Sequence, residues 1–158
     1  MTINGQSISV SAKAAVIRDG RILLIRYDDP ITHYNLPGGR LLNGESLHEA
    51  VERKLRLECA AEGVARRLLF VYEHIPDPVR PEPGDYQKVQ FNFLAELLPG
   101  SEPSNPPAAH DQSAVEWHDL ADLPKLTLYP PVTQKLFEAL GTTTDYDSLL
   151  RDADVDPQ

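Results

Sequence analysis

The stretch from 46 to 59 constrains the fold most, because it predicts a capped amphipathic helix directly after an irregular loop. Ser46 can accept a hydrogen bond at the start of this helix, and Glu49, three positions later, completes a capping box. The apolar residues that recur at helical spacing are Leu47, Ala50, Val51 and Leu55. The preceding loop, Leu36-Pro37-Gly38-Gly39, contains residues that interrupt regular structure. We therefore expect a loop followed by a helix that buries one face.

Strand-forming stretches flank this helix on both sides. Residues 12–17 and 21–27 are rich in apolar side chains, and Asp19-Gly20 between them favours a tight hairpin turn. Further strands are predicted at 67–75, 89–98 and 114–117. Strands that alternate with helices predict a mixed α/β layout in which helices cover a sheet.

The C-terminal part divides into a helix and a tail. Residues 131–140 predict a helix with Pro131 in its first turn and Gly141 just past its end. Residues 142–158 are rich in aspartate and poor in apolar side chains. We expect a single domain over 1–141 and an acidic, mobile tail over 142–158.

Composition and charge exclude several classes of partner. The net charge of −9 repels nucleic acid unless Lys and Arg cluster, and no such cluster stands out along the sequence. No apolar run reaches the roughly 18 residues of a membrane span, and the first residues lack the features of a secretory signal. Cys59 is the only cysteine, and we expect its thiol to be buried and inert. A cytoplasmic protein without nucleic-acid or membrane partners is predicted, and a few local donors could still hold a small anion.

Five residues around the helix follow a recognisable spacing. They are Gly39, Glu45, Arg53, Leu55 and Glu58. The spacing resembles the signature box of the Nudix family, G-x5-E-x7-R-E-U-x-E-E-x-G-U, in which U is a bulky aliphatic residue. Leu55 stands at an aliphatic place, where a structural role is expected. The resemblance extends over about residues 12–140, because the hairpin before the box and Val115-Glu116-Trp117 after it are also typical of the family.

The resemblance implies a fold and a chemistry. Members of this MutT-like family fold as an α/β/α sandwich with a mixed central sheet. They hydrolyse a nucleoside diphosphate linked to another group, for example ADP-ribose or a nucleotide, and they use Mg²⁺ or Mn²⁺. Because family members are often dimers, the resemblance also implies a homodimer.

Three box positions normally supply the carboxylates that bind the metal, and two of them have changed here. Side chains at i, i+3 and i+4 are neighbours on one helix face and can share a cation. In this chain the three positions are Lys54, Leu57 and Glu58. The late glycine of the box is replaced by Ala60, and we expect the chain to turn later, at Gly63. The box is therefore degenerate, with Glu58 as its catalytic and metal-binding carboxylate.

The other box residues receive roles from the resemblance. Glu45 and Arg53 would mainly brace the loop against the helix, and Glu45 is also a candidate catalytic residue that reaches a metal through water. The carbonyl of Gly39 is a candidate metal ligand, and Gly38 would let the chain approach a ligand closely. Lys54 would either lie near the diphosphate and supply part of the missing positive charge, or extend into solvent.

Two groups outside the box are candidates by residue type and position alone. The acids that could help to rebuild a metal site are Glu73, Glu82, Asp85, Glu102 and Asp111. The aromatic residues that could stack on a base are Tyr27, Tyr34, Tyr72, Phe91 and Tyr129. Solvated loop acids and packed core aromatics are the alternative in each case.

The sequence leaves two functions open. The first is a Nudix hydrolase with impaired or atypical metal-dependent catalysis, in which Mg²⁺ or Mn²⁺ is held by Glu58, a backbone oxygen and loop acids. The second is a catalytically inactive module, needing no cofactor, that binds a nucleotide-like metabolite as a sensor or regulatory subunit. A purely structural interaction domain is a third alternative.

Overall fold

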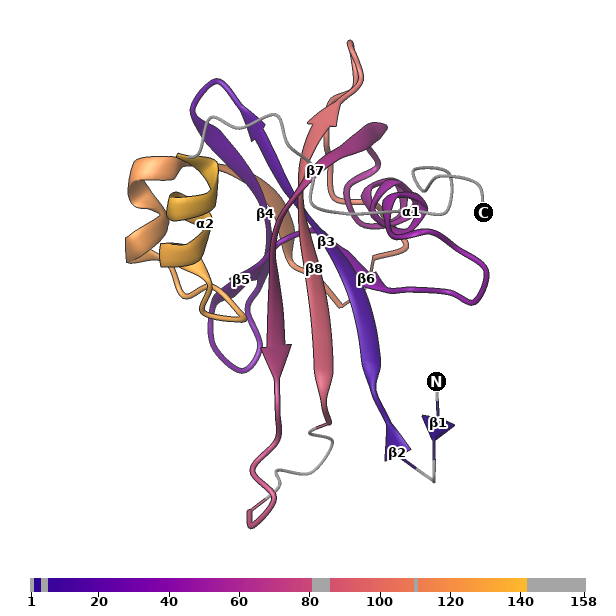
Figure 1. Ribbon diagram of the computed structural model, residues 1–158. Coiled ribbons are helices and arrows are strands. Elements are labelled where there is room, and N and C mark those ends of the chain that lie inside the picture. Colours follow the sequence, from indigo (N-terminus) through magenta and orange to yellow (C-terminus); the bar gives the residue numbers. More distant parts are fainter. Residues whose placement is uncertain (1, 4–5, 81–85, 110, 142–158) are drawn as a thin grey trace.

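The computed structural model describes residues 2–3, 6–80, 86–109 and 111–141, which form a central sheet with a helix on each face (Figure 1). The sheet runs in the order β5 (His33–Asn35), β4 (Arg21–Tyr27), β3 (Ser9–Arg18), β8 (Lys88–Leu97) and β7 (Gly63–His74). In addition, β6 (Gly38–Arg40) pairs with β3, and β9 (Ala114–Asp119) pairs with β4. β3 and β8 are parallel, whereas the other pairs are antiparallel, so the sheet is mixed.

The remaining elements are helices and one short strand pair. The helices are α1 (Leu47–Cys59), the 3-10 helix η1 (Leu120–Lys125) and α2 (Thr133–Leu140). β1 (Thr2–Ile3) and β2 (Gln6–Ser7) pair with each other, apart from the main sheet.

Two hydrophobic cores lie on opposite faces of the sheet. Leu55 and Cys59 of α1 pack in one core with Phe93 of β8, and all three are fully buried. Leu136 of α2 packs in the other core with Ile22 of β4. Because helices bury apolar side chains against both faces, the predicted α/β/α sandwich with a mixed central sheet is confirmed.

The two strongest local predictions are confirmed. Asp19 and Gly20 both have positive φ, 52° and 71°, as a tight turn between two antiparallel strands requires. Ser46 accepts a hydrogen bond from the backbone of Glu49, and the side chain of Glu49 accepts one from the backbone of Ser46. The predicted capping box therefore starts α1.

The end of α1 differs from the prediction. The helix turns at Ala60, which takes a left-handed conformation with φ 49° and ψ 36°, and not later at Gly63. The Ala60 amide donates to the Arg56 carbonyl at 3.2 Å, and the Ala61 amide donates to the Leu55 carbonyl at 3.3 Å. These bonds satisfy helix-end carbonyls at a conformation that is costly for alanine.

Several boundaries also differ, because tertiary pairing extends or shortens what local pattern predicts. β7 begins at Gly63, opposite Leu97 of β8, and not at residue 67. α2 begins at Thr133, so Pro131 lies before the helix, and Gly141 ends it in a right-handed conformation. β5 and β6, with three residues each, were not predicted, since they are too short to show a periodicity.

Two further predictions concern the C-terminal tail and the single cysteine. The expected acidic tail over 142–158 lies outside the described residues. Cys59 is buried, as predicted, and burial raises the pKa of its thiol to about 12. Within the described residues, no helix has the length and apolar character needed to cross a membrane.

Candidate functional site

Arg53 joins α1 to the loop that precedes it. Its Nε donates to Glu45 Oε1 at 2.6 Å, and its Nη2 donates to Glu45 Oε2 at 3.1 Å and to the Arg40 carbonyl at 3.0 Å. Glu45 Oε2 also accepts a hydrogen bond from the amide of Leu42. The hydrogen bonds from Arg53 hold the pKa of Glu45 below its usual range, so this carboxylate stays charged. The contact has the geometry that a bracing role requires.

The helix face that would carry the metal ligands holds an ion pair. Lys54 Nζ lies 3.7 Å from Glu58 Oε2, and Glu58 Oε1 accepts a hydrogen bond of 2.8 Å from the Gly38 amide. Only 23% of the Lys54 side chain and 16% of the Glu58 side chain is exposed. Leu57, by contrast, is 57% exposed. This face therefore presents one carboxylate, and each of its two oxygens already faces a cation or an N–H donor.

Two glycines let the loop approach this ion pair. Gly38 has φ +140°, and a Cβ there would lie 2.2 Å from the carbonyl oxygen of Ala12, so a side chain does not fit. A Cβ on Gly39 would lie 2.6 Å from Lys54 Cε and 3.1 Å from Lys54 Nζ. Lys54 is therefore held against the backbone of Gly39 and does not extend freely into solvent.

Lys13 of β3 places a second ammonium group on the other side of the loop. Its Nζ donates to the carbonyl oxygens of Leu36 and Gly38, both at 3.3 Å. Burial lowers the pKa of Lys13; Glu58 acts in the opposite direction, and Lys54 lowers the pKa further. The loop that contains Gly38 thus lies between two lysines and one glutamate.

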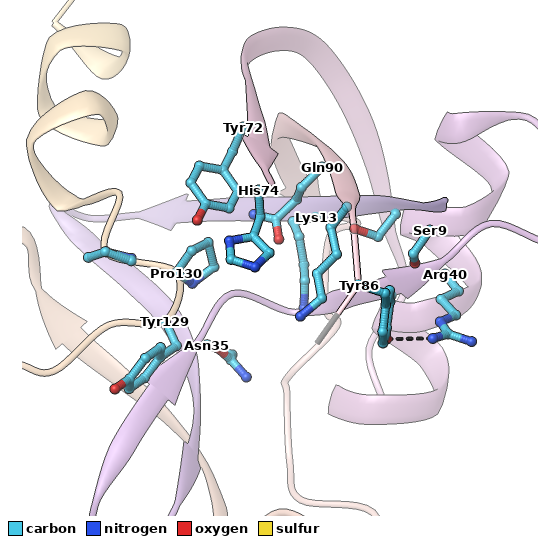
Figure 2. A pocket seen from close by; sticks show the side chains of 14 residues that line it. Ser9, Lys13, Asn35, Arg40, Tyr72, His74, Tyr86, Gln90, Tyr129 and Pro130 are labelled. Carbon is cyan, nitrogen blue, oxygen red and sulfur yellow. Dashed lines mark hydrogen bonds between the residues drawn. The ribbon is translucent and has the colours of Figure 1, made fainter. Parts of the chain in front are cut away.

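An open cleft of about 520 Å³ lies beside this loop, over strands β3, β6, β8 and β7 (Figure 2). Lys13 and Gly39 both line it, so the cleft reaches the backbone against which Lys54 is packed. Its cationic side chains also include Arg40 and Lys88, and none of the described residues that line it is Asp or Glu. Cations that are scattered along the sequence are therefore gathered in space, although the chain carries a net charge of −9.

The aromatic candidates separate into two groups. Tyr72 and Tyr129 line the cleft. Tyr27 and Phe91 pack against the core on the α1 face, and Tyr34 packs against the core on the α2 face. Only the first two are placed where a ring could contact a ligand in this cleft.

Of the acidic candidates, Asp111 is on a loop that reaches Glu58, because the next residue, Gln112, donates from its side chain to the Glu58 carbonyl at 2.7 Å. Glu102 pairs with Arg18, with hydrogen bonds of 2.9 and 3.1 Å, and Glu73 and Asp111 are exposed. Glu82 and Asp85 lie outside the described residues. Among the residues that the structure places, no group of three or more His, Cys, Asp or Glu side chains could hold a metal ion.

The donor set at the box does not fit a metal centre of the kind that the resemblance implies. Mg²⁺ in proteins prefers carboxylate and other oxygen ligands, and here a single carboxylate is paired with an ammonium group. A divalent cation would have to displace Lys54 from Glu58. We therefore derive no catalytic step through Mg²⁺ or Mn²⁺, and the roles of Glu58, Gly39 and Glu45 in metal binding and catalysis stay predictions.

Three residues of the site were missed by reasoning from the sequence. Lys13 carried a signal, because it is the one charged residue in the apolar stretch 12–17. Arg40 directly follows Gly39 of the box, and Lys88 begins a strand. Nothing in the spacing of the three indicates that they share one cleft.

Comparison with known proteins shows the family. The model of the NUDIX domain matches residues 9–140, which is most of the chain. A MutT NUDIX hydrolase from Burkholderia pseudomallei is 30% identical, and the match covers 88% of this chain and 100% of that structure with a TM-score of 0.67. This chain therefore belongs to the Nudix family.

Two further similarities add a relative and a fold match. The ADP-ribose pyrophosphatase of Methanocaldococcus jannaschii is 31% identical over 120 residues, which is 75% of this chain and 66%, just under two thirds, of that protein. The ORF135 protein of E. coli is 20% identical and covers 89% of this chain and 95% of its own, with a TM-score of 0.65, which supports the fold alone.

Proposed function

We propose that this chain binds a nucleoside diphosphate linked to another group in the cleft, and that lysine and arginine side chains neutralise the diphosphate in place of a divalent metal. Catalysis by the metal-dependent route of the box is then impaired or absent, and the domain serves as a sensor or regulatory subunit. The observation that carries the proposal is the Lys54–Glu58 ion pair against Gly39, beside a cleft in which every charged lining residue that the structure describes is cationic.

Charge supports binding. Lys13 lines the cleft directly, and Lys54 packs against Gly39, which also lines it. A unit charge pair 4 Å apart gains about 4 kcal/mol at the effective dielectric constant near a protein surface. Lys13, with Arg40 and Lys88 nearby, offers an anionic ligand a local field opposite to that of the whole chain, and Lys54 adds less because Glu58 lies 3.7 Å from it.

The chemistry of the box argues against efficient hydrolysis. A metal ion stabilises charge in the transition state and activates water, which lowers the barrier by several kcal/mol. Every loss of about 1.4 kcal/mol slows a reaction tenfold. Lys54 can offset negative charge, but an ammonium group does not activate water as a bound metal does.

ADP-ribose is the first ligand to test, because the relative from M. jannaschii carries the name ADP-ribose pyrophosphatase. In the alternative proposal the chain is still a hydrolase. Glu58 and Gly39 occupy the positions of metal ligands in the family box, and a metal that displaces Lys54 from Glu58 would give slow or atypical hydrolysis. This alternative rests on the retained glutamate and needs Mg²⁺ or Mn²⁺, so the two proposals differ in their response to a chelator.

The experiment is titration calorimetry with ADP-ribose in EDTA and again in Mg²⁺, together with a hydrolysis assay in both buffers. We expect binding that persists in EDTA and is weaker in Lys54→Gln, by about tenfold or less, because Lys54 acts on the ligand through the backbone of Gly39 and not by direct contact. Lys125→Gln is the matched control, because Lys125 is an exposed lysine on η1, paired with Asp122.

Two results would contradict the proposal. Turnover that requires Mg²⁺ and disappears in Glu58→Gln would favour the hydrolase. Equal affinity in Lys54→Gln and Lys125→Gln would show that Lys54 does not contribute to ligand binding.

A further inference from the structure

The two ends of the cleft differ in chemistry (Figure 2). We call one the cationic end; its residues are Ser9, Ser11, Arg40, Tyr86 and Lys88. We call the other the aromatic end; its residues are Asn35, Tyr72, His74, Tyr129, Pro130 and Pro131. In Figure 2, Tyr86 and Arg40 lie on one side of Lys13, and Tyr72, Pro130 and Tyr129 lie on the other. A ligand that spans the cleft therefore meets different chemistry at each end.

The cationic end is built by strand pairing. Arg40 of β6 lies opposite Ser11 of β3, and Lys88 of β8 lies opposite Ser9. β6 and β8 flank β3, so their backbones lie about 10 Å apart, given the usual spacing between neighbouring strands. Ser9 and Ser11 belong to the same face of β3, because side chains alternate along a strand. Two cations thus flank a pair of hydroxyl groups.

Tyr86 keeps these two cations close together. The Arg40 guanidinium lies 5.0 Å from the centroid of the Tyr86 ring, and Lys88 Nζ lies 4.8 Å from it. An Arg40 N–H also donates to the Tyr86 hydroxyl. Each cation–ring contact contributes about 0.5–1 kcal/mol at an exposed site. An aromatic ring carries no negative charge, and none of the described residues that line the cleft is Asp or Glu, so an anionic ligand can pair with both cations.

The aromatic end suits a planar, mainly uncharged group. Tyr129 is 53% exposed, and its ring packs edge-on against His33 with the centroids 5.5 Å apart. Pro130 and Pro131 continue this apolar rim, and Tyr72 also lines this end of the cleft. Stacking on such rings stabilises a nucleobase by about 1–3 kcal/mol. Lys13 lies between the two ends in Figure 2, where a diphosphate would be held.

We infer that the cleft selects a nucleotide derivative with an additional phosphate on the group attached to its diphosphate, and that Arg40 and Lys88 bind this phosphate. The inference rests on the proposed function, and it sharpens the ligand class. ADP-ribose places a neutral ribose at the cationic end, so this ligand brings no anionic group into direct contact with Arg40 and Lys88. A phosphate there accepts hydrogen bonds from both cations and from the serine hydroxyls.

The test compares three ligands by titration calorimetry in EDTA. They are ADP-ribose, ADP-ribose with a phosphate on its terminal ribose, and ADP-ribose with a phosphate on its adenosine ribose. The last two have the same charge and composition, so only the position of the phosphate differs. We expect the terminal phosphate to tighten binding about tenfold or more, one charge-assisted contact being enough for this, and the adenosine phosphate to give no gain.

Variants then assign the preference to residues. In Arg40→Gln and in Lys88→Gln we expect the affinity for the terminally phosphorylated ligand to fall by more than the affinity for ADP-ribose, so that its advantage is lost. Lys125→Gln, on an exposed lysine of η1, should keep the preference. Thermal unfolding of each variant shows whether it is folded, since Arg40 and Lys88 also contact Tyr86.

The outcomes separate the inference from the proposed function. If ADP-ribose binds but the terminal phosphate gives no gain, the inference is wrong and the proposed function stands. A gain of equal size from both phosphates, or a larger gain from the adenosine phosphate, also overturns it. If none of the three ligands binds, the proposed function fails and the inference fails with it.

Discussion

Arg53 and Lys54 are neighbours in the sequence, yet they belong to two regions of the box: one keeps the residues of the family, and the other has lost two of its carboxylates. Arg53 and Glu45 keep the family residues, and they join helix and loop through two side-chain hydrogen bonds and one bond to a backbone carbonyl. Lys54 and Leu57 replace two carboxylates, and the helix and the loop still meet through the Glu58–Gly38 hydrogen bond. The contacts that hold the helix to the loop therefore do not require the two missing carboxylates of the metal face.

Restoring the metal face is expected to have the largest effect. In the double variant Lys54→Glu/Leu57→Glu the three box positions become carboxylates at i, i+3 and i+4 again. We expect Mg²⁺-dependent hydrolysis of ADP-ribose to rise by about 100-fold or more, since bound metal lowers such barriers by several kcal/mol. Rates in Mg²⁺ and in EDTA measure this.

The isosteric variant Lys54→Gln/Leu57→Gln is the control, because it removes the same side chains without adding carboxylates. If the glutamate variant stays folded and binds no Mg²⁺, then more than the metal face has changed, and the two regions are not separable.

Breaking the brace should mainly affect stability. Arg53→Leu leaves the Glu45 carboxylate, whose side chain is 12% exposed, without its guanidinium partner. We expect a loss of about 2 kcal/mol in the free energy of unfolding, less than for a fully buried pair, measured by urea denaturation. The control is Arg66→Leu, which breaks the exposed Arg66–Glu96 pair; such pairs contribute about 1 kcal/mol or less. Equal losses would show that the brace does no more than a surface ion pair.

Replacing Lys13 should weaken ligand binding and leave stability nearly unchanged, the opposite of what we expect for Arg53→Leu. In Lys13→Gln we expect affinity for ADP-ribose to fall about tenfold, the effect of one charged contact. The free energy of unfolding should change by less than about 1 kcal/mol, because the cost of burying the ammonium offsets its two long hydrogen bonds. Calorimetry and urea denaturation give the two quantities. A loss of stability as large as in Arg53→Leu would place Lys13 with the scaffold.

The smallest expected effect is a dependence on pH that belongs to the brace. The pKa of Glu45 is lowered from its ordinary value of 4.5 by hydrogen bonds from Arg53. The unfolded chain therefore binds more protons than the folded one at acid pH, and stability falls as pH drops through the lowered pKa. We expect the free energies of unfolding of wild type and Arg53→Leu, measured from pH 7 to pH 3, to differ most at pH 7 and to approach each other toward pH 3. A difference in the free energy of unfolding that stays the same over this pH range would contradict the prediction.

The parts of the fold that follow from local chemistry could be predicted from the sequence. The Asp19-Gly20 turn and the Ser46–Glu49 capping box depend on residues a few positions apart. The start of β7 at Gly63 could not be predicted, because it depends on pairing with Leu97. Ala60 was misjudged for a related reason: hydrogen bonds at the helix end outweigh the conformational preference of alanine.

The site was predictable only as far as the box extends. The box identified Lys54 and Glu58 as the altered metal face, and the structure places them 3.7 Å apart. The cleft, in contrast, depends on β6 and β8 flanking β3, which brings Arg40 and Lys88 to either side of two serines. A parallel pairing between strands about 80 positions apart leaves no local sequence signal.

Gly39 separates the Lys54–Glu58 ion pair from the cleft with backbone alone. Because Gly39 has no side chain, Lys54 can pack against the backbone there, and its charge acts on a bound anion across a short distance. A methyl group at position 39 would push the end of the lysine away from the backbone, and the electrostatic attraction between Lys54 and a bound anion would become weaker. In this chain the glycine inherited from a metal-binding motif therefore sets how strongly a residue outside the cleft influences what is bound inside it.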